Sequence, residues 1–315
     1  MRTLITARSY RPEDRDVWDA FVDVSKNGTF MLKRGYVEYH ADRFVDASVV
    51  FEDESGDVAA VMPASRHGDE VRSHGGLTYG GIVSGRNMTV KKMLEVFDAL
   101  RCHLKNECVS SLMYKRVPAI YYRYPSDEDL YALFRNEAML VRRDIASTID
   151  LSNAIPFSPV RVRYAKKARK AGCVVMETAD YERYVDLLTE VLMTRHNARP
   201  PHTAGELRLL ASRFPDVIRL FCAFRGEEML AGVLVFDTPS VVHTQYIANS
   251  VAGRDVGALD LVVDNLVHEQ FAGRRYFDFG ICTENGGLFL NEGLVGQKEM
   301  FGGRGVAYDF YKMEV

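Results

Sequence analysis

The sequence predicts a mixed α/β fold in which one unit occurs twice. Each unit is a strand meander followed by an amphipathic helix and a closing strand. In the second half, three apolar, β-branched runs are separated by short turns, and apolar residues at helical spacing follow them. The first half has the same order of elements, although its residues differ. With 315 residues, 47% of them hydrophobic, the chain is long enough for two cores.

The second half supplies the clearer pattern. Its predicted strands are Val217–Phe224, Met229–Phe236, Val241–Ala248 and, near the end, Tyr276–Phe279. A loop with two glycines, Asn249–Ala258, follows the third strand. The next apolar residues recur every three or four positions, which predicts a helix between that loop and the last strand; they are Leu259, Val262, Val263, Leu266, Val267 and Phe271.

The first half repeats this order with shorter strands. They are expected at Ala47–Phe51, Val58–Ala64, Glu70–Ser73 and Ser111–Tyr114, with an amphipathic helix from Val90 to Leu100. A glycine-rich run from His74 to Ile82 stands where the second half has its loop. Prolines and polar residues cluster between Leu151 and Pro159, which predicts a boundary there. We therefore expect one domain over 1–150 and a second over 151–315.

Composition excludes several classes of protein. The formal net charge is −3, so overall charge gives no reason to expect a nucleic-acid partner. The five cysteines form no CxxC pair or Cys/His cluster, which predicts reduced thiols in a cytoplasmic protein and no metal site. The first 25 residues do not read as a signal peptide, and no apolar run approaches the roughly 20 residues that span a bilayer.

The loop before the predicted helix is a candidate phosphate site. Backbone N–H groups at the start of a helix bind anions, and glycine allows a phosphate to approach closely. The candidate cofactor-binding residues are Arg254, Asp255, Val256, Gly257 and Ala258. A plain strand-to-helix turn is the alternative interpretation.

Three polar residues on predicted strands are candidates for catalysis. Asp278 lies between two phenylalanines on a buried strand, as a general base or as a structural acceptor of backbone donors. His243 and Tyr246 are on the third meander strand, where histidine can accept a proton and tyrosine can donate one. Strand alternation puts these two on opposite faces unless a bulge intervenes, and a buried, hydrogen-bonded histidine is the alternative for His243.

The strand, loop and helix resemble the cofactor-binding core of the GNAT acyltransferase superfamily. Arg254-Asp255-Val256-Gly257 matches the first part of its Arg/Gln-x-x-Gly-x-Gly/Ala loop, while Leu259 stands at the last position. The chain as a whole resembles the FemAB-like tandem-GNAT transferases, and more narrowly those of bacterial polysaccharide gene clusters. The segments that carry this resemblance are Asn27–Phe30, Tyr39–Phe44, Thr78–Gly81, Phe277–Gly280 and Leu290–Gly302.

The resemblance implies roles for further residues. Lys298 would lie in the active cleft, where a cation can stabilise an anionic carbonyl oxygen or hold a phosphate. A solvated surface lysine is the alternative. The first domain would be a degenerate GNAT-like domain that shapes the acceptor cleft. The candidate substrate-binding residues are His74, Tyr79, Glu284 and Asn285.

Two other segments are candidates for substrate contact. The run 161–170 is basic and contains no acid, so it could bind the phosphates of a nucleotide-linked substrate or a tRNA end, or be a solvated helix face. The proline-rich loop from His196 to His202 is a candidate lid.

The resemblance predicts an N-acyltransferase with acyl-coenzyme A, for example acetyl-coenzyme A, as the donor. The expected acceptor is an amine, namely an amino sugar or a nucleotide-linked sugar in cell-surface polysaccharide synthesis. An aminoacyl-tRNA-dependent aminoacyltransferase of the FemAB type is one alternative. A non-catalytic ligand-binding protein built from two decayed transferase units is the other.

Overall fold

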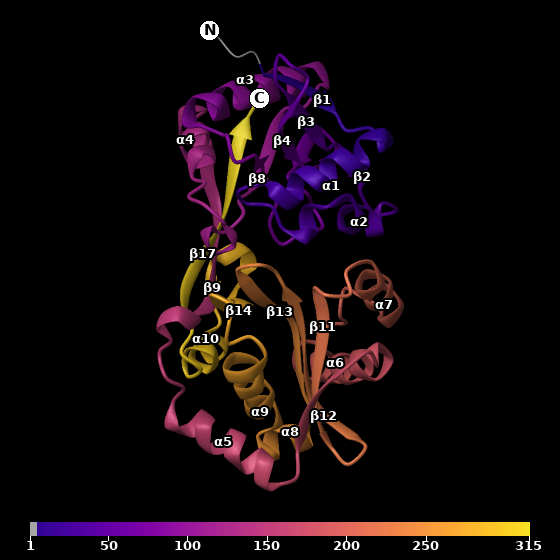
Figure 1. Ribbon diagram of the computed structural model, residues 1–315, viewed down its shortest axis with the longest axis vertical. Coiled ribbons are helices and arrows are strands. Elements are labelled where there is room, and N and C mark those ends of the chain that lie inside the picture. Colours follow the sequence, from indigo (N-terminus) through magenta and orange to yellow (C-terminus); the bar gives the residue numbers. More distant parts are fainter. Residues whose placement is uncertain (1–4) are drawn as a thin grey trace. The chain divides into compact units, whose positions relative to one another are not determined.

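The computed structural model describes residues 5–315, and among these the side chains of residues 195 and 196 are not described. The chain divides into two compact units (Figure 1). The first contains Met1–Asp144, Asn285–Gly287 and Ala307–Val315, and the second contains Ile145–Glu284 and Leu288–Val306. Two long strands, β9 (Met139–Asp150) and β17 (Arg304–Glu314), contribute residues to both. These boundaries differ from the expected 1–150 and 151–315 because the chain's last strand returns to the first unit.

The first unit has two groups of strands. Its elements are β1 (Thr6–Ser9), α1 (Arg15–Val24), α2 (Arg34–Val37), β2 (Val45–Asp46), β3 (Val49–Glu52), β4 (Val58–Met62), β5 (Ser65–His67), β6 (Glu70–Arg72), β7 (Val83–Ser84), α3 (Val90–Asn106), β8 (Ser111–Lys115) and α4 (Glu128–Arg135). The strand orders are β1-β3-β4-β7 and β17-β8-β6-β5-β2. Helix α3 buries Phe97 and Leu100 in the same core as Phe51 and Leu112, as its predicted amphipathic pattern requires.

The second unit is a mixed sheet with helices on both faces. Its elements are α5 (Pro159–Lys170), β10 (Val174–Thr178), α6 (Tyr181–His196), α7 (Ala204–Arg213), β11 (Ile218–Arg225), β12 (Glu228–Asp237), β13 (Val241–Asn249), α8 (Val251–Val256), α9 (Ala258–Asn265), β14 (Tyr276–Ile281), β15 (Thr283–Glu284), β16 (Phe289–Leu290) and α10 (Glu292–Glu299). The strand order is β10-β11-β12-β13-β14-β9, and only the β13–β14 pair in this order is parallel.

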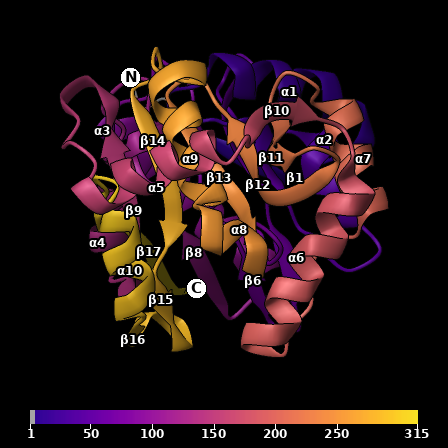
Figure 2. The same cartoon turned by 90° about the horizontal axis from the view of Figure 1, so that it is seen from below.

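The predicted meander is confirmed as β11, β12 and β13, and the closing strand as β14. Alternate residues of these strands, such as Val233 and Val235, are buried in one core with Val262 of α9. Helix α9 packs on β11, β12 and β13, and α5 packs along α9. Helix α6 packs on β12 and β13 as well, and Figure 2 shows it apart from α9 on the other side of these strands. The parallel β13–β14 connection through α8 and α9 places β14 beside β13, which sets up the site.

Candidate functional site

Strands β13 and β14 separate partway along their length. They pair at Val241–Tyr276, Val242–Phe277 and His243–Asp278, and the pairing ends there. Beyond this point β14 turns at Gly280 and β13 continues to Asn249. The two strands therefore separate near the middle of the second unit's sheet, and we call the space between them the gap.

A β-bulge in β13 decides which face His243 and Tyr246 occupy. His243 is opposite Phe236 of β12, Thr244 is opposite Val235, and the next paired residue is Tyr246, opposite Leu234. Gln245 is the extra residue. Since Phe236 and Leu234 are two apart on their own strand, they share a face, and so do His243 and Tyr246. The condition for both candidates to lie on one side of the sheet is thus met.

Asp278 is fully buried and fully hydrogen-bonded. Its Oδ1 accepts from Thr148 Oγ1 at 2.9 Å and from the backbone N–H of Gly280 at 3.0 Å. Its Oδ2 lies 2.8 Å from His243 Nδ1. The exposed fraction of the residue is 0%, so an ionised carboxylate here depends on these donors. The structure therefore brings two predicted residues, His243 and Asp278, into direct contact.

His243 is hydrogen-bonded through one ring nitrogen, Nδ1, and the other, Nε2, is available to a substrate. Its exposed fraction is 8%, and its Nδ1 is engaged by Asp278. Among the described residues, Nε2 has no hydrogen-bond partner. When Nδ1 carries the proton that Asp278 accepts, Nε2 is an unprotonated acceptor at the edge of the gap. This is the arrangement of a general base with an orienting carboxylate.

Gly280 is the point where these groups meet. Its φ of 71° is in the left-handed region that favours glycine. A Cβ at this position would be 3.2 Å from His243 Cε1. Its N–H binds Asp278, and its carbonyl oxygen accepts from Lys298 Nζ at 2.9 Å. The backbone of one glycine therefore links three of the predicted catalytic residues.

Lys298 is buried on the last turns of α10. Its Nζ also donates to the carbonyl oxygen of Ile281 at 2.9 Å, and its exposed fraction is 6%. Burial lowers the pKa of this ammonium group, and the neighbouring Cys282 and Asp278 partly oppose that effect. The alternative of a solvated surface lysine is wrong. A buried cation fixed beside the gap can interact with negative charge that develops there.

A cavity of about 500 Å³ adjoins Lys298 and is lined by residues of α6, α9 and α10. Its lining is polar and apolar in about equal parts, and the polar side chains are those of Arg161, Asn249, Arg254, Asp260, Gln297 and Lys298. Ile247 and Phe279, from the two separating strands, also line it. By strand alternation these residues face away from His243 and Asp278. Val191 and Leu192 of α6 line the cavity as well, so it is not confined to the α9 face and extends to the gap beside which the His243–Asp278 pair lies.

The expected loop Asn249–Ala258 is wrong, because most of it is helix α8. The N–H of Gly253 donates to Ser250 Oγ, that of Arg254 to the carbonyl of Ser250, and that of Gly257 to the carbonyl of Gly253. These amides are satisfied within the turn itself. Asp255 is exposed, Val256 packs against the core and Ala258 is buried. Arg254 is the one of the five predicted cofactor residues that lines the cavity.

The first turn of α9 is covered by the backbone of α5 and contains a carboxylate of its own, that of Asp260. Gly257 has a φ of 86°, and a Cβ there would be 2.6 Å from the carbonyl oxygen of Tyr164 in α5. In the first turn of α9, the buried carboxylate of Asp260 pairs with Arg161 at 3.1 Å. Burial raises the pKa of Asp260, whereas Arg161 lowers it. Sequence reasoning missed this pair, since Arg161 and Asp260 are 99 residues apart.

Tyr246 contacts a loop that was a candidate lid. Its hydroxyl lies 2.5 Å from His202 Nδ1, and the two rings meet edge to face. Its backbone carbonyl accepts from Tyr184 of α6 at 2.9 Å. His202 is buried beside the face that carries His243. The side chain of His196, the other histidine of this loop, lies outside the described residues.

The predicted substrate-binding residues are not gathered at this gap. His74 and Tyr79 are buried in the first unit, where His74 stacks on His40 and the Tyr79 hydroxyl donates to Thr29. Burial lowers the pKa of His74 to about 3. Glu284 and Asn285 are exposed in the β15–β16 hairpin, where Glu284 accepts from Asn291 at 2.8 Å.

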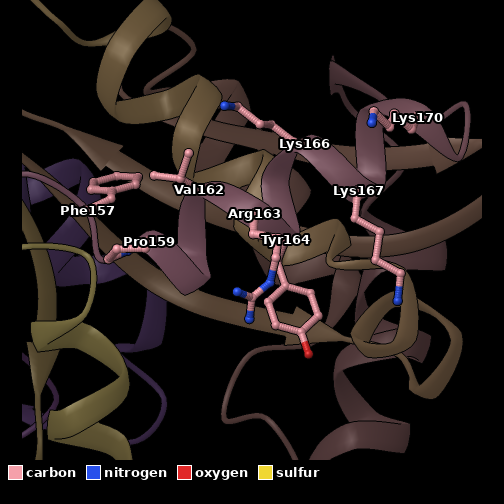
Figure 3. Close-up of a pocket in the computed structure, with 8 residues that line it drawn as sticks. All are labelled: Phe157, Pro159, Val162, Arg163, Tyr164, Lys166, Lys167 and Lys170. Atoms are coloured by element: carbon pink, nitrogen blue, oxygen red, sulfur yellow. The ribbon is translucent and has the colours of Figure 1, made fainter.

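The basic run 161–170 forms helix α5. Figure 3 shows the side chains on its outer surface, which line a depression of about 790 Å³. Ala165 and Ala168 face α9, and Arg169 pairs with Asp264.

Comparisons with known proteins agree with this geometry. Residues 161–287 match a family model described as an acetyltransferase (GNAT) domain. The structure is similar to a crystal structure of FemX, with a TM-score of 0.68, 11% identity, and 96% of each chain covered. It is also similar to L-PGS from Bacillus licheniformis, with a TM-score of 0.64, 11% identity, and coverage of 97% of this chain and 92% of the other. No match was found among curated proteins.

A further similar structure is a tandem GNAT protein from the clavulanic acid biosynthesis pathway. The TM-score is 0.51, the identity is 12%, and the match covers 99% of this chain and 98% of the other. These structural likenesses establish a mixed α/β fold of tandem GNAT-like units. Within residues 5–315, no helix combines the length and the apolar character needed to cross a membrane.

Proposed function

Because residues 161–287 match a GNAT acetyltransferase domain and the whole chain has the fold of FemX and of a tandem GNAT protein, we propose that it transfers an acyl group from acyl-coenzyme A to an amine. One observation carries the proposal. A cavity lined by Arg254 and Lys298 reaches the gap between β13 and β14 beside which the His243–Asp278 pair lies. Donor and acceptor could then meet at this gap.

In this proposal the acyl arm occupies the cavity and its thioester lies at the gap. Ile247 and Phe279 would contact its apolar part, and Arg254 would hold phosphate at the other end. A cavity of about 500 Å³ is within the usual size range of small-ligand sites. Lys298 would stabilise the negative charge on the carbonyl oxygen as the amine adds.

The amine would approach from the His243 side. Its nitrogen attacks the thioester carbon, the new C–N bond forms, and the C–S bond breaks as the thiolate leaves. His243 Nε2 accepts the proton that the amine nitrogen loses, while Asp278 stabilises the imidazolium through Nδ1–H. The thiolate then takes up a proton, for which the Tyr246 hydroxyl is the proposed donor. No covalent enzyme intermediate is required.

The acceptor that we propose is an amino sugar, free or nucleotide-linked, in cell-surface polysaccharide synthesis. Support for this class comes from the order of motifs along the chain, such as Thr78–Gly81 and Phe277–Gly280. Of the four expected acceptor contacts, the exposed Glu284 and Asn285 remain proposed, whereas His74 and Tyr79 are buried within the first unit.

Calorimetric titration with acetyl-coenzyme A tests the donor. We expect binding in the micromolar range that is lost in Arg254→Glu, because the charge at the phosphate end of the cavity is reversed. Arg225→Glu is the matched control, since Arg225 is an exposed arginine of the same unit that pairs only with Glu228 among the described residues. Absence of binding to the wild-type protein would contradict the proposed donor.

An aminoacyl-tRNA donor is the second candidate, and two observations favour it. The amides of α8 are bonded within their own turn, and Asp260 places a carboxylate at the start of α9. Both features oppose a pyrophosphate at this helix terminus. A gel shift with charged tRNA that disappears on reversing the charges of Lys166 and Lys167, together with no coenzyme binding, would favour this candidate.

A further inference from the structure

The exposed cations of α5 fall on two sides of the helix. Tyr164 and Lys167 are three residues apart and therefore neighbours on the surface, with Arg163 next to Lys167. Lys166 is two residues from Tyr164 and projects elsewhere. Figure 3 shows Arg163, Tyr164 and Lys167 on one side of the ribbon and Lys166 on the other. We call the first group, Arg163, Tyr164 and Lys167, the Tyr164 face.

The Tyr164 face is continuous with the proposed donor cavity. Tyr164 lines both the cavity of about 500 Å³ and the outer depression of about 790 Å³. Lys167 Nζ donates to the carbonyl oxygen of Asp255 in α8, at 2.6 Å, next to Arg254. Its Nζ is also 5.8 Å from the centre of the Tyr164 ring. A ligand that leaves the cavity past Arg254 therefore meets this face.

The charged side chains that line the outer depression are all positive. Four of the eight residues that line the outer depression are lysine or arginine, and none is acidic. Arg163 makes no ion pair or hydrogen bond with any residue that the structure describes. An unpaired guanidinium at Arg163 and the ammonium of Lys167, held by a backbone carbonyl beside an aromatic ring, suit a ligand that combines phosphates with a flat base.

The first turn of α9 offers no free backbone amides to a phosphate, which explains why cations on a neighbouring surface would be needed. Because Asp260 and the bonded amides of α8 leave no backbone cradle for phosphate, a phosphate-bearing donor needs side-chain cations instead. The Tyr164 face supplies them at the mouth of the cavity.

We infer that the Tyr164 face binds the adenosine phosphate end of the acyl donor. Arg163 and Lys167 contact the phosphates, and the adenine ring packs on Tyr164. The inference rests on the proposed function and adds the part of the donor that the cavity does not hold.

The test compares adjacent lysines. Titrations with coenzyme A and with adenosine 3′,5′-bisphosphate are done on the wild-type protein and on Lys167→Glu, Lys166→Glu, Tyr164→Ala and Tyr164→Phe. We expect Lys167→Glu and Tyr164→Ala to weaken both ligands at least about tenfold, while Lys166→Glu and Tyr164→Phe stay within about threefold. Lys167→Gln, with thermal unfolding measured alongside, separates loss of charge from loss of folding.

Equal weakening by Lys166→Glu and Lys167→Glu would overturn the inference, because it would indicate general attraction to a basic helix. The proposed function would survive if acetyl-coenzyme A bound, Arg254→Glu abolished binding, and Lys167→Glu and Tyr164→Ala had no effect; only the inference would then fail. If the wild-type protein bound neither coenzyme A nor adenosine 3′,5′-bisphosphate but bound an RNA hairpin ending in CCA, both the inference and the proposed function would be overturned.

Discussion

His243 Nδ1 lies 2.8 Å from Asp278 Oδ2, and the other oxygen of the same carboxylate accepts from Thr148 and from the backbone of Gly280. The carboxylate is thus fixed on one side by donors that do not titrate and on the other by the imidazole. This decides the tautomer, since Nδ1 must carry the proton and Nε2 is left to accept one. The two interpretations of Asp278, a structural acceptor and a catalytic group, are therefore compatible.

Asp278→Asn should lower kcat about 100-fold with little change in KM. The asparagine amide can donate to Nδ1, which would place the proton on Nε2 and remove the base. Steady-state kinetics with a saturating acyl donor checks this. Thr148→Val is the control, because it removes one hydrogen bond to Asp278 without changing the tautomer and should cost about 1 kcal/mol of stability. An Asp278→Asn enzyme with wild-type kcat would exclude His243 as the base.

Gly280→Ala should reduce both stability and activity. A Cβ there would lie 3.2 Å from His243 Cε1, and the left-handed φ adds a backbone cost of about 1 kcal/mol. Gly226→Ala has the same kind of backbone cost at a φ of 59° with open space around the added atom. Chemical denaturation and initial rates of the two variants should therefore separate backbone strain, present in both, from displacement of His243, present in one. Equal activity of the two variants would contradict the placement of His243.

Lys298→Met should be less active and less stable than the wild-type protein. It removes the cation and leaves the carbonyls of Gly280 and Ile281 without their donor, at a cost of about 1–3 kcal/mol for each group that stays unpaired. Because burial lowers the pKa of Lys298, the ammonium form is lost at a lower pH than for an ordinary lysine. We expect kcat to fall on the alkaline side earlier than an exposed lysine would predict. That alkaline fall should be absent from the pH profile of Lys298→Arg, whatever its residual rate.

His74 should make the first unit sensitive to acid. Burial, with His40 and Lys115 nearby, lowers its folded-state pKa to about 3, below the ordinary value of 6.5. Between these two values the unfolded chain binds more protons than the folded one, so stability is full above about pH 6.5 and is lost as pH falls toward 3. His74→Asn, which keeps an acceptor for the N–H of Gly76, should have a shallower fall in unfolding free energy over this window. An unchanged slope from pH 6.5 to 4 would assign the acid sensitivity to other groups.

Local patterns were sufficient for most of the second unit. The meander strands and β14 follow from apolar, β-branched runs between turn residues. The position of Asp278 between two phenylalanines predicted that it lies on a buried strand. Helix α8 was missed because its six residues, Val251–Val256, include one glycine, are followed by another and carry no apolar period. Lys298 of α10 was identified from the resemblance of its motif. Its burial could not be predicted, because the residues of α10 have no clear apolar face.

By itself, therefore, the sequence determined the type and order of the elements and the identity of the polar residues on β13, β14 and α10. Only the tertiary structure decided which of those residues meet. The extra residue Gln245 puts His243 and Tyr246 on one face, and the parallel pairing of β13 with β14 brings His243 to Asp278 across 35 positions. Both depend on hydrogen bonds between strands distant in the chain, whereas propensity and periodicity report only on neighbours along it.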